Sequence, residues 1–254
     1  MNDGSFASRV RARELLVGTF ISSASPAIAE AAATGGLDWL IVDLEHGVSD
    51  GAAANGIVRS LSPRLPVLVR TPPDNPHAAE LALDAGATGI MLPRMESADE
   101  AGSAFARTSY AHSRGLARAV AAWDWGAKTG DPLAADAQIV RIAQIETVAA
   151  LAAAEAIAAL PLVDALFLGA VDLALDARRL NATVDAEDAA ARVAAAAARA
   201  GKAAGAMIGA ADQVEGWHAR GFSLLACSAD VRIVAEHSAR VAVEAARVRK
   251  RLLD

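Results

Sequence analysis

Ionisable side chains gather directly after an apolar run in the stretch IVDLEHGVSD, residues 41–50. Asp43, Glu45 and His46 are three titratable groups within four positions, at the point where a buried strand would end. A single acid at such a point would be expected to cap a helix or close a turn. Two acids with a histidine can also orient a base beside a bound cation. The triple therefore favours a role in chemistry over a role in capping.

Polar residues end three further apolar runs. Arg70 closes PVLVR, Gln144 and Glu146 stand in QIE, and Asp172 ends the turn GAVD. Because the side chains of a strand alternate, Gln144 and Glu146 point to the same side. A carboxylate buried there without a partner would be costly. These residues are therefore candidates for a shared polar site.

A divalent cation would relieve that cost. Glu146 and Asp172 at neighbouring strand ends would supply two hard oxygen ligands and leave other positions to water or substrate, as Mg²⁺ and Mn²⁺ tolerate. The spacing leaves a structural alternative open, in which Asp172 caps a helix and Glu146 pairs with Arg70 or another arginine. Arg70 itself is either a salt-bridge partner or a guanidinium that stabilises an enolate oxygen.

Short apolar runs recur along the chain and alternate with helical patterns such as NPHAAELALDAG at 75–86. Runs that are apolar on both faces are typical of parallel strands covered by helices. In a chain of 254 residues without a linker, this repetition predicts an α/β fold, a (β/α)8 TIM barrel forming a single domain over residues 1–254. Spacing alone leaves a doubly wound sheet open. We count nine runs, of which GLARAV at 115–120 is the weakest and suits an active-site connection equally well.

Composition limits the classes of partner. The formal charge of −6 comes without a basic stripe, so we expect no nucleic acid and no membrane among the partners, and a small-molecule substrate instead. No apolar run reaches the length of a membrane span. The single cysteine, Cys227, excludes an internal disulfide framework, and the N-terminus lacks the apolar run of a signal peptide. The cytoplasm is the simplest location.

The C-terminal segment predicts an amphipathic helix with a basic end. One stripe of this helix carries Val231, Val234, Ser238, Val241, Ala245, Val248 and Leu252. A continuous apolar stripe needs a surface to pack on. That surface is either the chain's own barrel or a neighbouring subunit.

Motifs spread over nearly the whole chain resemble the HpcH/HpaI aldolase family, the metal-dependent class II pyruvate aldolases of the phosphoenolpyruvate/pyruvate barrel superfamily. They are AEAAATGGLDWLIVDLEHGVSD, PVLVR, ELALDAGATGIMLPRMESADEA, QIET, VDALFLGAVDLALD and a late GK. The resemblance implies a (β/α)8 barrel that cleaves a 4-hydroxy-2-oxo acid to pyruvate and an aldehyde. It also implies a homo-oligomer, a trimer or hexamer, with the C-terminal helix exchanged between subunits.

The resemblance also assigns roles to individual residues. It implies that Glu146 and Asp172 are the ligands of a divalent metal ion, Mg²⁺, Mn²⁺ or Co²⁺. Arg70 matches the arginine that stabilises the pyruvate enolate. His46, with Asp43, matches the histidine that handles protons.

Two further parts of the substrate site follow from the same resemblance. Asp84, in LALDAG, matches an acid that approaches a neighbouring subunit's site. Gln144 and the backbone of Gly169, Ala170 and Val171 match the pocket for the pyruvate carboxylate. Here the family turn Gly-Pro-Ala-Asp-Leu-Ser reads GAVDLA, so the turn lacks its proline and the hydroxyl after it.

Two alternatives to an aldolase stay open at the level of sequence. The stretch PRMESADEA is similar to the citrate-lyase β-subunit branch, which acts on acyl-CoA thioesters. Against that branch, DLEH has the aldolase arrangement and no basic pocket for a CoA phosphate is evident. The other alternative is a metal-binding barrel scaffold without turnover, because fold does not fix function.

Overall fold

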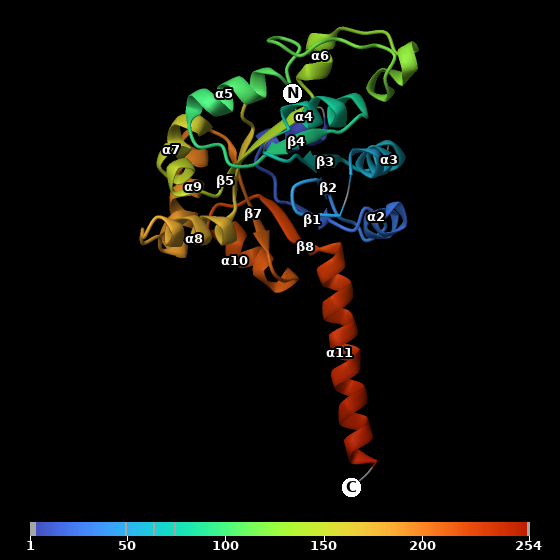
Figure 1. Cartoon of the computed structure of the whole chain (residues 1–254). Helices are drawn as coiled ribbons and strands as arrows, with labels where there is room; N and C mark the ends of the chain where they lie inside the picture. The colour runs from blue at the N-terminus through green and yellow to red at the C-terminus, as the bar shows by residue number, and fades with distance from the viewer. Residues whose placement is uncertain (1–3, 49, 63, 74, 253–254) are drawn as a thin grey trace.

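Eight parallel strands pair in chain order, and β8 pairs with β1 to close a barrel. The computed structural model, shown in Figure 1, describes residues 4–48, 50–62, 64–73 and 75–252. The strands are β1 (Leu16–Ile21), β2 (Trp39–Asp43), β3 (Val67–Arg70), β4 (Gly89–Leu92), β5 (Val140–Ile145), β6 (Ala165–Leu168), β7 (Ala203–Ile208) and β8 (Leu224–Ala229). The fold is therefore a (β/α)8 barrel, as the sequence predicts.

Helices follow the strands and surround the barrel. The α-helices are α1 (Phe6–Arg11), α2 (Pro26–Ala33), α3 (Gly51–Leu61), α4 (Pro76–Asp84), α5 (Ala98–Ala106), α6 (Pro132–Asp136), α7 (Val148–Ala158), α8 (Ala170–Arg179), α9 (Ala186–Arg199), α10 (Val214–Ala219) and α11 (Asp230–Arg251). Two 3₁₀ segments, η1 (Ala121–Gly126) and η2 (Ala211–Gln213), complete the described elements.

Side chains of the strands fill two compartments, which is why the runs are apolar on both faces. Inward-facing side chains such as Trp39, Ile41, Leu68 and Phe167 pack inside the barrel. Outward-facing side chains pack under the helices in two further clusters. The barrel interior is therefore a packed core, and polar chemistry is confined to its ends.

The expected strand over 115–120 does not exist. These residues are largely exposed and form bends that lead into η1, so the segment is a connection and not a strand. Because it runs from α5 toward the start of β5, it lies at the amino-terminal end of the barrel, and the expectation of an active-site connection is wrong for this chain. The pairing of β4 with β5 leaves no place for a strand between them. Because the barrel closes at eight strands, a further parallel strand would have no free edge to join.

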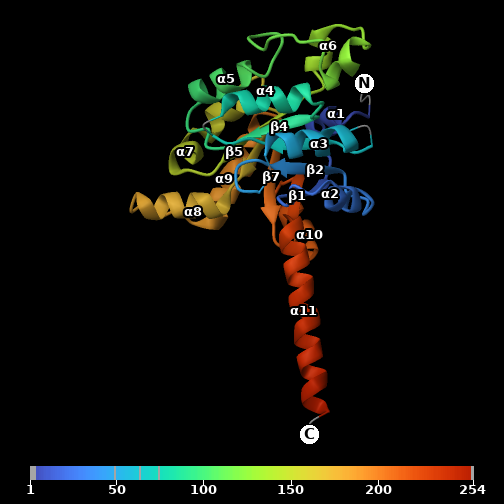
Figure 2. The ribbon, with the colours of Figure 1, turned by 45° about the vertical axis from the view of Figure 1, so that its right-hand side comes forward.

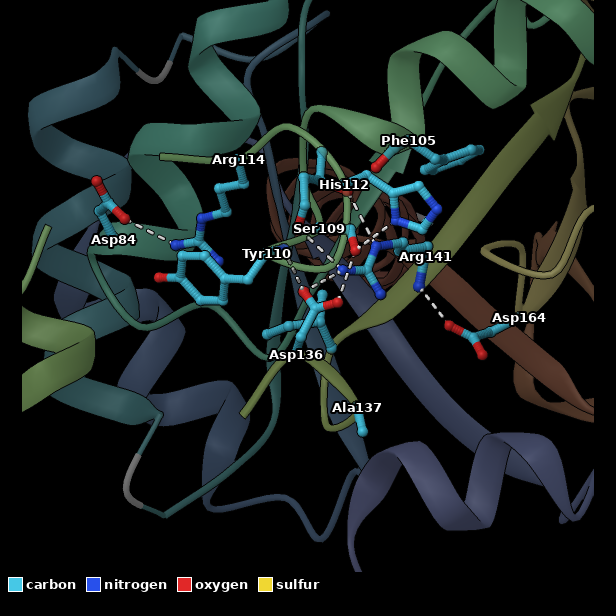
Figure 3. Close-up of polar contacts among 12 residues, drawn as sticks. Asp84, Phe105, Ser109, Tyr110, His112, Arg114, Asp136, Ala137, Arg141 and Asp164 are labelled. Carbon is cyan, nitrogen blue, oxygen red and sulfur yellow. Dashed lines mark hydrogen bonds and ion pairs between the residues drawn. The ribbon is translucent and has the colours of Figure 1, made fainter. Parts of the chain in front are cut away.

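A buried polar network holds this connection to the amino-terminal end of the barrel. The guanidinium of Arg141, at the start of β5, donates to Asp136 Oδ1 at 2.7 Å and to Thr108 Oγ1 at 2.9 Å. Its backbone N–H donates to Asp164 Oδ2, and Asp136 also accepts a hydrogen bond from Ser109 (Figure 3). Burial lowers the pKa of Arg141 although the Asp136 carboxylate opposes that shift. This end of the barrel has a structural role.

Helix α11 leaves the barrel at the end of β8 and projects away from it (Figures 1 and 2). Its apolar side chains Val231, Val234, Val241 and Leu252 are 50–79% exposed. The stripe that the sequence predicts is thus present on a helix that makes few contacts with its own barrel. No described helix is long and apolar enough to cross a membrane.

Candidate active site

The Arg70 guanidinium joins the ends of two neighbouring strands. Arg70 closes β3 and is paired in register with Asp43, which closes β2. Its Nε donates to Asp43 Oδ1 at 2.9 Å and its Nη2 to Oδ2 at 2.7 Å. Its Nη1 lies 3.1 Å from Glu45 Oε2, and the Phe20 ring packs 5.0 Å from the guanidinium carbon. Arg70 is only 8% exposed. These four contacts therefore hold a buried guanidinium in one position.

This pair stays charged although it is buried. Burial acts to raise the pKa of Asp43, but the hydrogen bonds and charge of Arg70 outweigh it, so this pKa lies below its usual value. Burial acts to lower the pKa of Arg70, and the Asp43 and Glu45 carboxylates raise it above its usual value instead. Arg70 is therefore a salt-bridge partner, which is one of the two roles that the sequence left open. It also keeps its full positive charge at the barrel mouth.

Glu146 follows β5 directly and is 2% exposed. Its Oε1 accepts a hydrogen bond at 2.9 Å from the backbone N–H of Arg94, a residue held at a φ of 55°. Its Oε2 accepts a hydrogen bond from Gln144 Nε2, which confirms that the two side chains share one side. Among the described residues, the buried Gln144 Oε1 has no hydrogen-bond partner. The Glu146 carboxylate is thus held by neutral donors and not by an arginine side chain.

The pKa of Glu146 lies near neutral pH. Burial, together with the nearby Glu45 and Asp172 carboxylates, raises its pKa to about 7, against the opposing charge of Arg70. Burial likewise raises the pKa of Glu45, with Asp43 and Asp172 adding to the effect. Acidic groups at the barrel mouth therefore outweigh the single Arg70 charge. Perturbed carboxylates of this kind are typical of functional sites.

Helix α8 begins beside this carboxylate. Its N-cap, Gly169, makes no side-chain cap, and the first bond within the helix runs from the Leu173 N–H to the Gly169 carbonyl. The amides of residues 170–172 therefore have no acceptor in the helix. Asp172 lies in the first turn and does not cap the helix, so that alternative for Asp172 is wrong. Val171 is 82% exposed beside it.

Gly169 packs directly on the acidic residue. A Cβ atom there would lie 2.6 Å from Glu146 Cβ, 2.9 Å from Glu146 Oε2 and 3.0 Å from Gln144 Nε2. Real Cβ atoms do not approach other atoms so closely. Residue 169 must therefore be glycine for the α8 turn to reach the carboxylate.

His46 is the most exposed of the ionisable candidate residues, with 58% of its side chain accessible. Its Nε2 lies 3.8 Å from Glu45 Oε2, and its backbone N–H donates to Asp43 Oδ1. The acid nearest the imidazole is therefore Glu45, whereas Asp43 is engaged by Arg70. Glu45 is visible in DLEH, but its pairing with both Arg70 and His46 is a through-space feature that the spacing does not contain.

Asp84 lies away from this cluster. It ends α4 and accepts a hydrogen bond at 2.7 Å from Arg114, whose guanidinium stacks on Tyr110 (Figure 3). Because α4 leads into β4, Asp84 belongs to the amino-terminal end of the barrel. The structure therefore brings together the other candidates in this chain and separates Asp84 from them.

The acidic residues also fit a divalent cation. Within the described residues, no group of three or more His, Cys, Asp and Glu is arranged to hold a metal ion alone. Glu146 and Asp172 suit a cation that takes its other ligands from water or substrate, as Mg²⁺ does. The pKa of Glu146 is raised first by burial and then by the Glu45 and Asp172 carboxylates, and Gln144 Oε1 remains without a donor. A cation would offset the cost of burying these carboxylates together.

Comparison with known proteins identifies the family. The family model described as HpcH/HpaI aldolase/citrate lyase matches residues 16–236. The chain belongs to this family. It is 38% identical over 236 residues to a hydroxypyruvate/pyruvate aldolase of Paraburkholderia phytofirmans, and the aligned region covers 88% of this chain and 90% of that protein. It is 37% identical over 186 residues, 70% of each chain, to a 4-hydroxy-2-oxovalerate aldolase of Novosphingobium aromaticivorans.

A solved structure supports the same assignment. The HpcH/HpaI aldolase/citrate lyase family protein of Burkholderia cenocepacia superposes with a TM-score of 0.85 at 33% identity. The match covers 97% of this chain and 100% of that chain. Members of the HpcH/HpaI family generally depend on a divalent metal ion, and the aldolases among the relatives support a lyase activity for this member.

Glu146 should make stability depend on pH in metal-free protein. Its folded pKa of about 7 lies above the usual 4.5, so between these values the native state binds more protons than the unfolded state and stability falls as pH rises. We expect the free energy of unfolding of wild type, relative to Glu146→Gln, to fall by up to about 3 kcal/mol from pH 4.5 to pH 7.5. Urea unfolding across this range measures the difference. A constant difference would contradict the raised pKa.

Gly169→Ala should displace the carboxylate or the α8 turn. Because the added methyl overlaps Glu146 and Gln144, we expect a loss of about 1–3 kcal/mol in the free energy of unfolding. Gly56→Ala, in helix α3, is the matched control, since its Cβ meets nothing within 4 Å and should stabilise the protein slightly. Thermal unfolding compares the two. Equal effects would show that Gly169 is not tightly packed.

Proposed function

We propose that this protein is a metal-dependent aldolase that cleaves a 4-hydroxy-2-oxo acid to pyruvate and an aldehyde. The observation that carries the proposal is the buried Glu146 carboxylate, with a pKa of about 7, near Asp172 and the Arg70 guanidinium. A 2-oxo acid presents a carboxylate and a carbonyl to such a site. The family and its aldolase relatives support this assignment.

The metal would be held by Glu146 and Asp172. When bound, a divalent cation such as Mg²⁺, Mn²⁺ or Co²⁺ would polarise the 2-oxo group and favour an enolate. Gln144 fixes Glu146 through its amide nitrogen and leaves its oxygen free to accept from a hydrated group. The protein thus supplies two charged ligands and one neutral acceptor.

Arg70 would stabilise the enolate oxygen. A guanidinium carries five N–H donors, and three of its nitrogens face Asp43 and Glu45, so two N–H groups are left over. They lie on a rigid side chain that needs no reorganisation during the reaction. Charge that develops on the substrate oxygen would therefore meet a preorganised cation.

His46 would handle the proton of the 4-hydroxyl. Removal of that proton breaks the C3–C4 bond, releases the aldehyde and leaves the electron pair in the enolate of pyruvate. The exposed imidazole can reach a substrate above the barrel mouth, and Glu45 stabilises the imidazolium that forms. His46 then returns a proton to C3 of the enolate. Asp43 assists by holding the backbone of His46.

The substrate carboxylate would bind at the start of α8. The free amides after Gly169 lie next to the helix N-terminus, which favours an anion. Residues Ala170 and Val171 contribute backbone groups there, so the absence of the family proline lowers preorganisation and not the number of donors.

An acyl-CoA lyase of the citrate-lyase type is less well supported. The relatives reported above are named as aldolases, and the DLEH arrangement is intact in the structure. Against a scaffold without turnover, the chain keeps Arg70 and His46 at the barrel mouth beside the acidic residues, and a metal site alone has no use for them.

Pyruvate α-proton exchange in deuterated water tests the function without knowledge of the aldehyde. We expect exchange that needs Mg²⁺, Mn²⁺ or Co²⁺ and that Glu146→Gln and Asp172→Asn each abolish with the fold intact. Glu155→Gln, a carboxylate on the outer surface of α7, is the control and should exchange normally. Full exchange in chelator-treated protein would contradict the metal proposal.

Arg70→Lys separates the electrophilic role from the structural one. Lysine keeps the charge but loses the fork, so we expect the exchange rate at saturating pyruvate to fall by roughly 10²-fold. The melting temperature is measured in parallel. A variant that melts early but turns over normally when folded would favour a purely structural Arg70.

We also propose that the protein is a homo-oligomer, a trimer or hexamer, in which α11 packs on another subunit. The exposed apolar side chains of a helix that projects from the barrel support this proposal. Truncation after Val231 should reduce the assembly to smaller species in light scattering. An unchanged mass would remove α11 from the interface.

A further inference from the structure

A buried carboxylate, Asp230, stands at the root of α11 and reaches a different part of the chain. It is 4% exposed. Its Oδ1 accepts from the Ser22 N–H at 2.9 Å, and its Oδ2 accepts from the Ser23 N–H at 3.2 Å and from the Ser23 hydroxyl at 2.5 Å. Ser22 and Ser23 directly follow β1, at the same end of the barrel as the candidate active site. None of the roles proposed above uses Asp230.

A β-bulge near the end of β8 precedes Asp230. Between β1 and β8 the pairing passes from Gly18 and Ala226 to Phe20 and Ala229, so β8 carries one extra residue. Ser228, within this bulge, has a φ of 61°. The chain thus accepts an unfavourable backbone conformation just before Asp230.

The hydrogen bonds of Asp230 differ from those of an ordinary acid in a first helical turn. Such an acid bonds to the amides of its own helix. Asp230 accepts from its own helix only at the adjacent Val231 N–H, and its other three contacts go to the segment after β1. Its position therefore serves the junction between α11 and that segment.

That segment in turn supports the DLEH loop. The Ser22 carbonyl accepts a hydrogen bond from the Val48 N–H at 3.0 Å. Gly47 packs so closely that a Cβ atom would lie 2.5 Å from the Asp43 carbonyl and 3.0 Å from the Ser22 carbonyl. The backbone of His46 lies directly before these two residues. The contacts run from Asp230, through Ser22, to the loop that carries His46.

From these contacts we propose that Asp230 is a positioning residue. It holds Ser22 and Ser23 so that the loop of residues 43–48 keeps His46 over the barrel mouth. Because Asp230 is the first residue of α11, it also links the position of that loop to the position of α11. Its catalytic consequence rests on the proposed function. The structural link itself does not.

Amide hydrogen exchange tests the link without any activity. Asp230→Ala and the near-isosteric Asp230→Asn should accelerate exchange in residues 22–25 and also in residues 43–48. Asp185→Ala is the matched control, because Asp185 caps α9 by accepting from the Asp188 N–H, far from this loop. It should leave both segments unchanged. Acceleration confined to residues 22–25 and the start of α11 would overturn the proposal.

Ser23→Ala keeps the test decisive if the Asp230 variants fold poorly. It removes one of the donors to Asp230 and leaves the backbone contacts in place. We expect a smaller acceleration in the same two segments. No change in residues 43–48 in this well-folded variant would also overturn the proposal.

Kinetics separate positioning from general loss of stability. In metal-loaded protein we expect Asp230→Asn to lower the maximal rate of pyruvate proton exchange roughly ten- to a hundred-fold, with the KM for pyruvate and the metal Kd little changed. A normal maximal rate would overturn the positioning role. If wild type shows no exchange at all, the proposed function fails, while the hydrogen-exchange result still decides the link.

Discussion

The fork between Arg70 and Asp43 is the contact on which the barrel mouth depends. It links the ends of β2 and β3 with two hydrogen bonds in a buried setting, where a lone charge would be expensive. Because Asp43 also accepts from the backbone of Glu45 and His46, the same carboxylate shapes the loop after β2. Removing Arg70 would leave the buried Asp43 carboxylate without its cation, and removing Asp43 would leave a buried guanidinium and also take the acceptor from the loop.

Charge balance follows from that fork. Arg70 donates both of its short hydrogen bonds to Asp43 and forms an ion pair with Glu45, while it acts on Glu146 through its charge alone. Burial raises the pKa of Glu146 and the Glu45 and Asp172 carboxylates add to that rise, whereas the hydrogen bonds and charge of Arg70 hold the pKa of Asp43 below its usual value. The two carboxylates stand at the ends of strands of one barrel. Their environments differ because only one of them faces the guanidinium.

The two ends of the barrel differ in their polar groups. At the amino-terminal end, Arg141, Asp136 and Thr108 form a network whose members partner one another. At the other end, acidic groups exceed basic ones and Gln144 Oε1 has no donor within the described chain. Buried atoms without a partner occur at both ends, since Arg114 Nε beside Asp84 is another, so the excess of carboxylates is what distinguishes the barrel mouth. Helix α11 leaves from this second end and is anchored there by Asp230.

The sequence by itself determined the order of elements and the face on which the polar residues lie. Apolar periodicity located the eight true strands, and alternation placed Gln144 and Glu146 together, because both are properties of neighbouring residues. The helical pattern at 75–86 corresponds to α4, and its first residue, Asn75, caps that helix. These are local effects, which a linear pattern records.

Only the tertiary structure decided which groups meet. The apolar residues of 115–120 predicted a ninth strand, but the barrel closes with eight strands and leaves no free edge for it to pair with. The pairing of Glu45 with Arg70, the contact of Gly169 with Glu146, and the reach of Asp230 to Ser22 join residues far apart in the chain. The pKa of Glu146 depends on such neighbours and on burial. Through-space distance and exclusion of water set these properties, and neither is encoded in the spacing of residues along a chain.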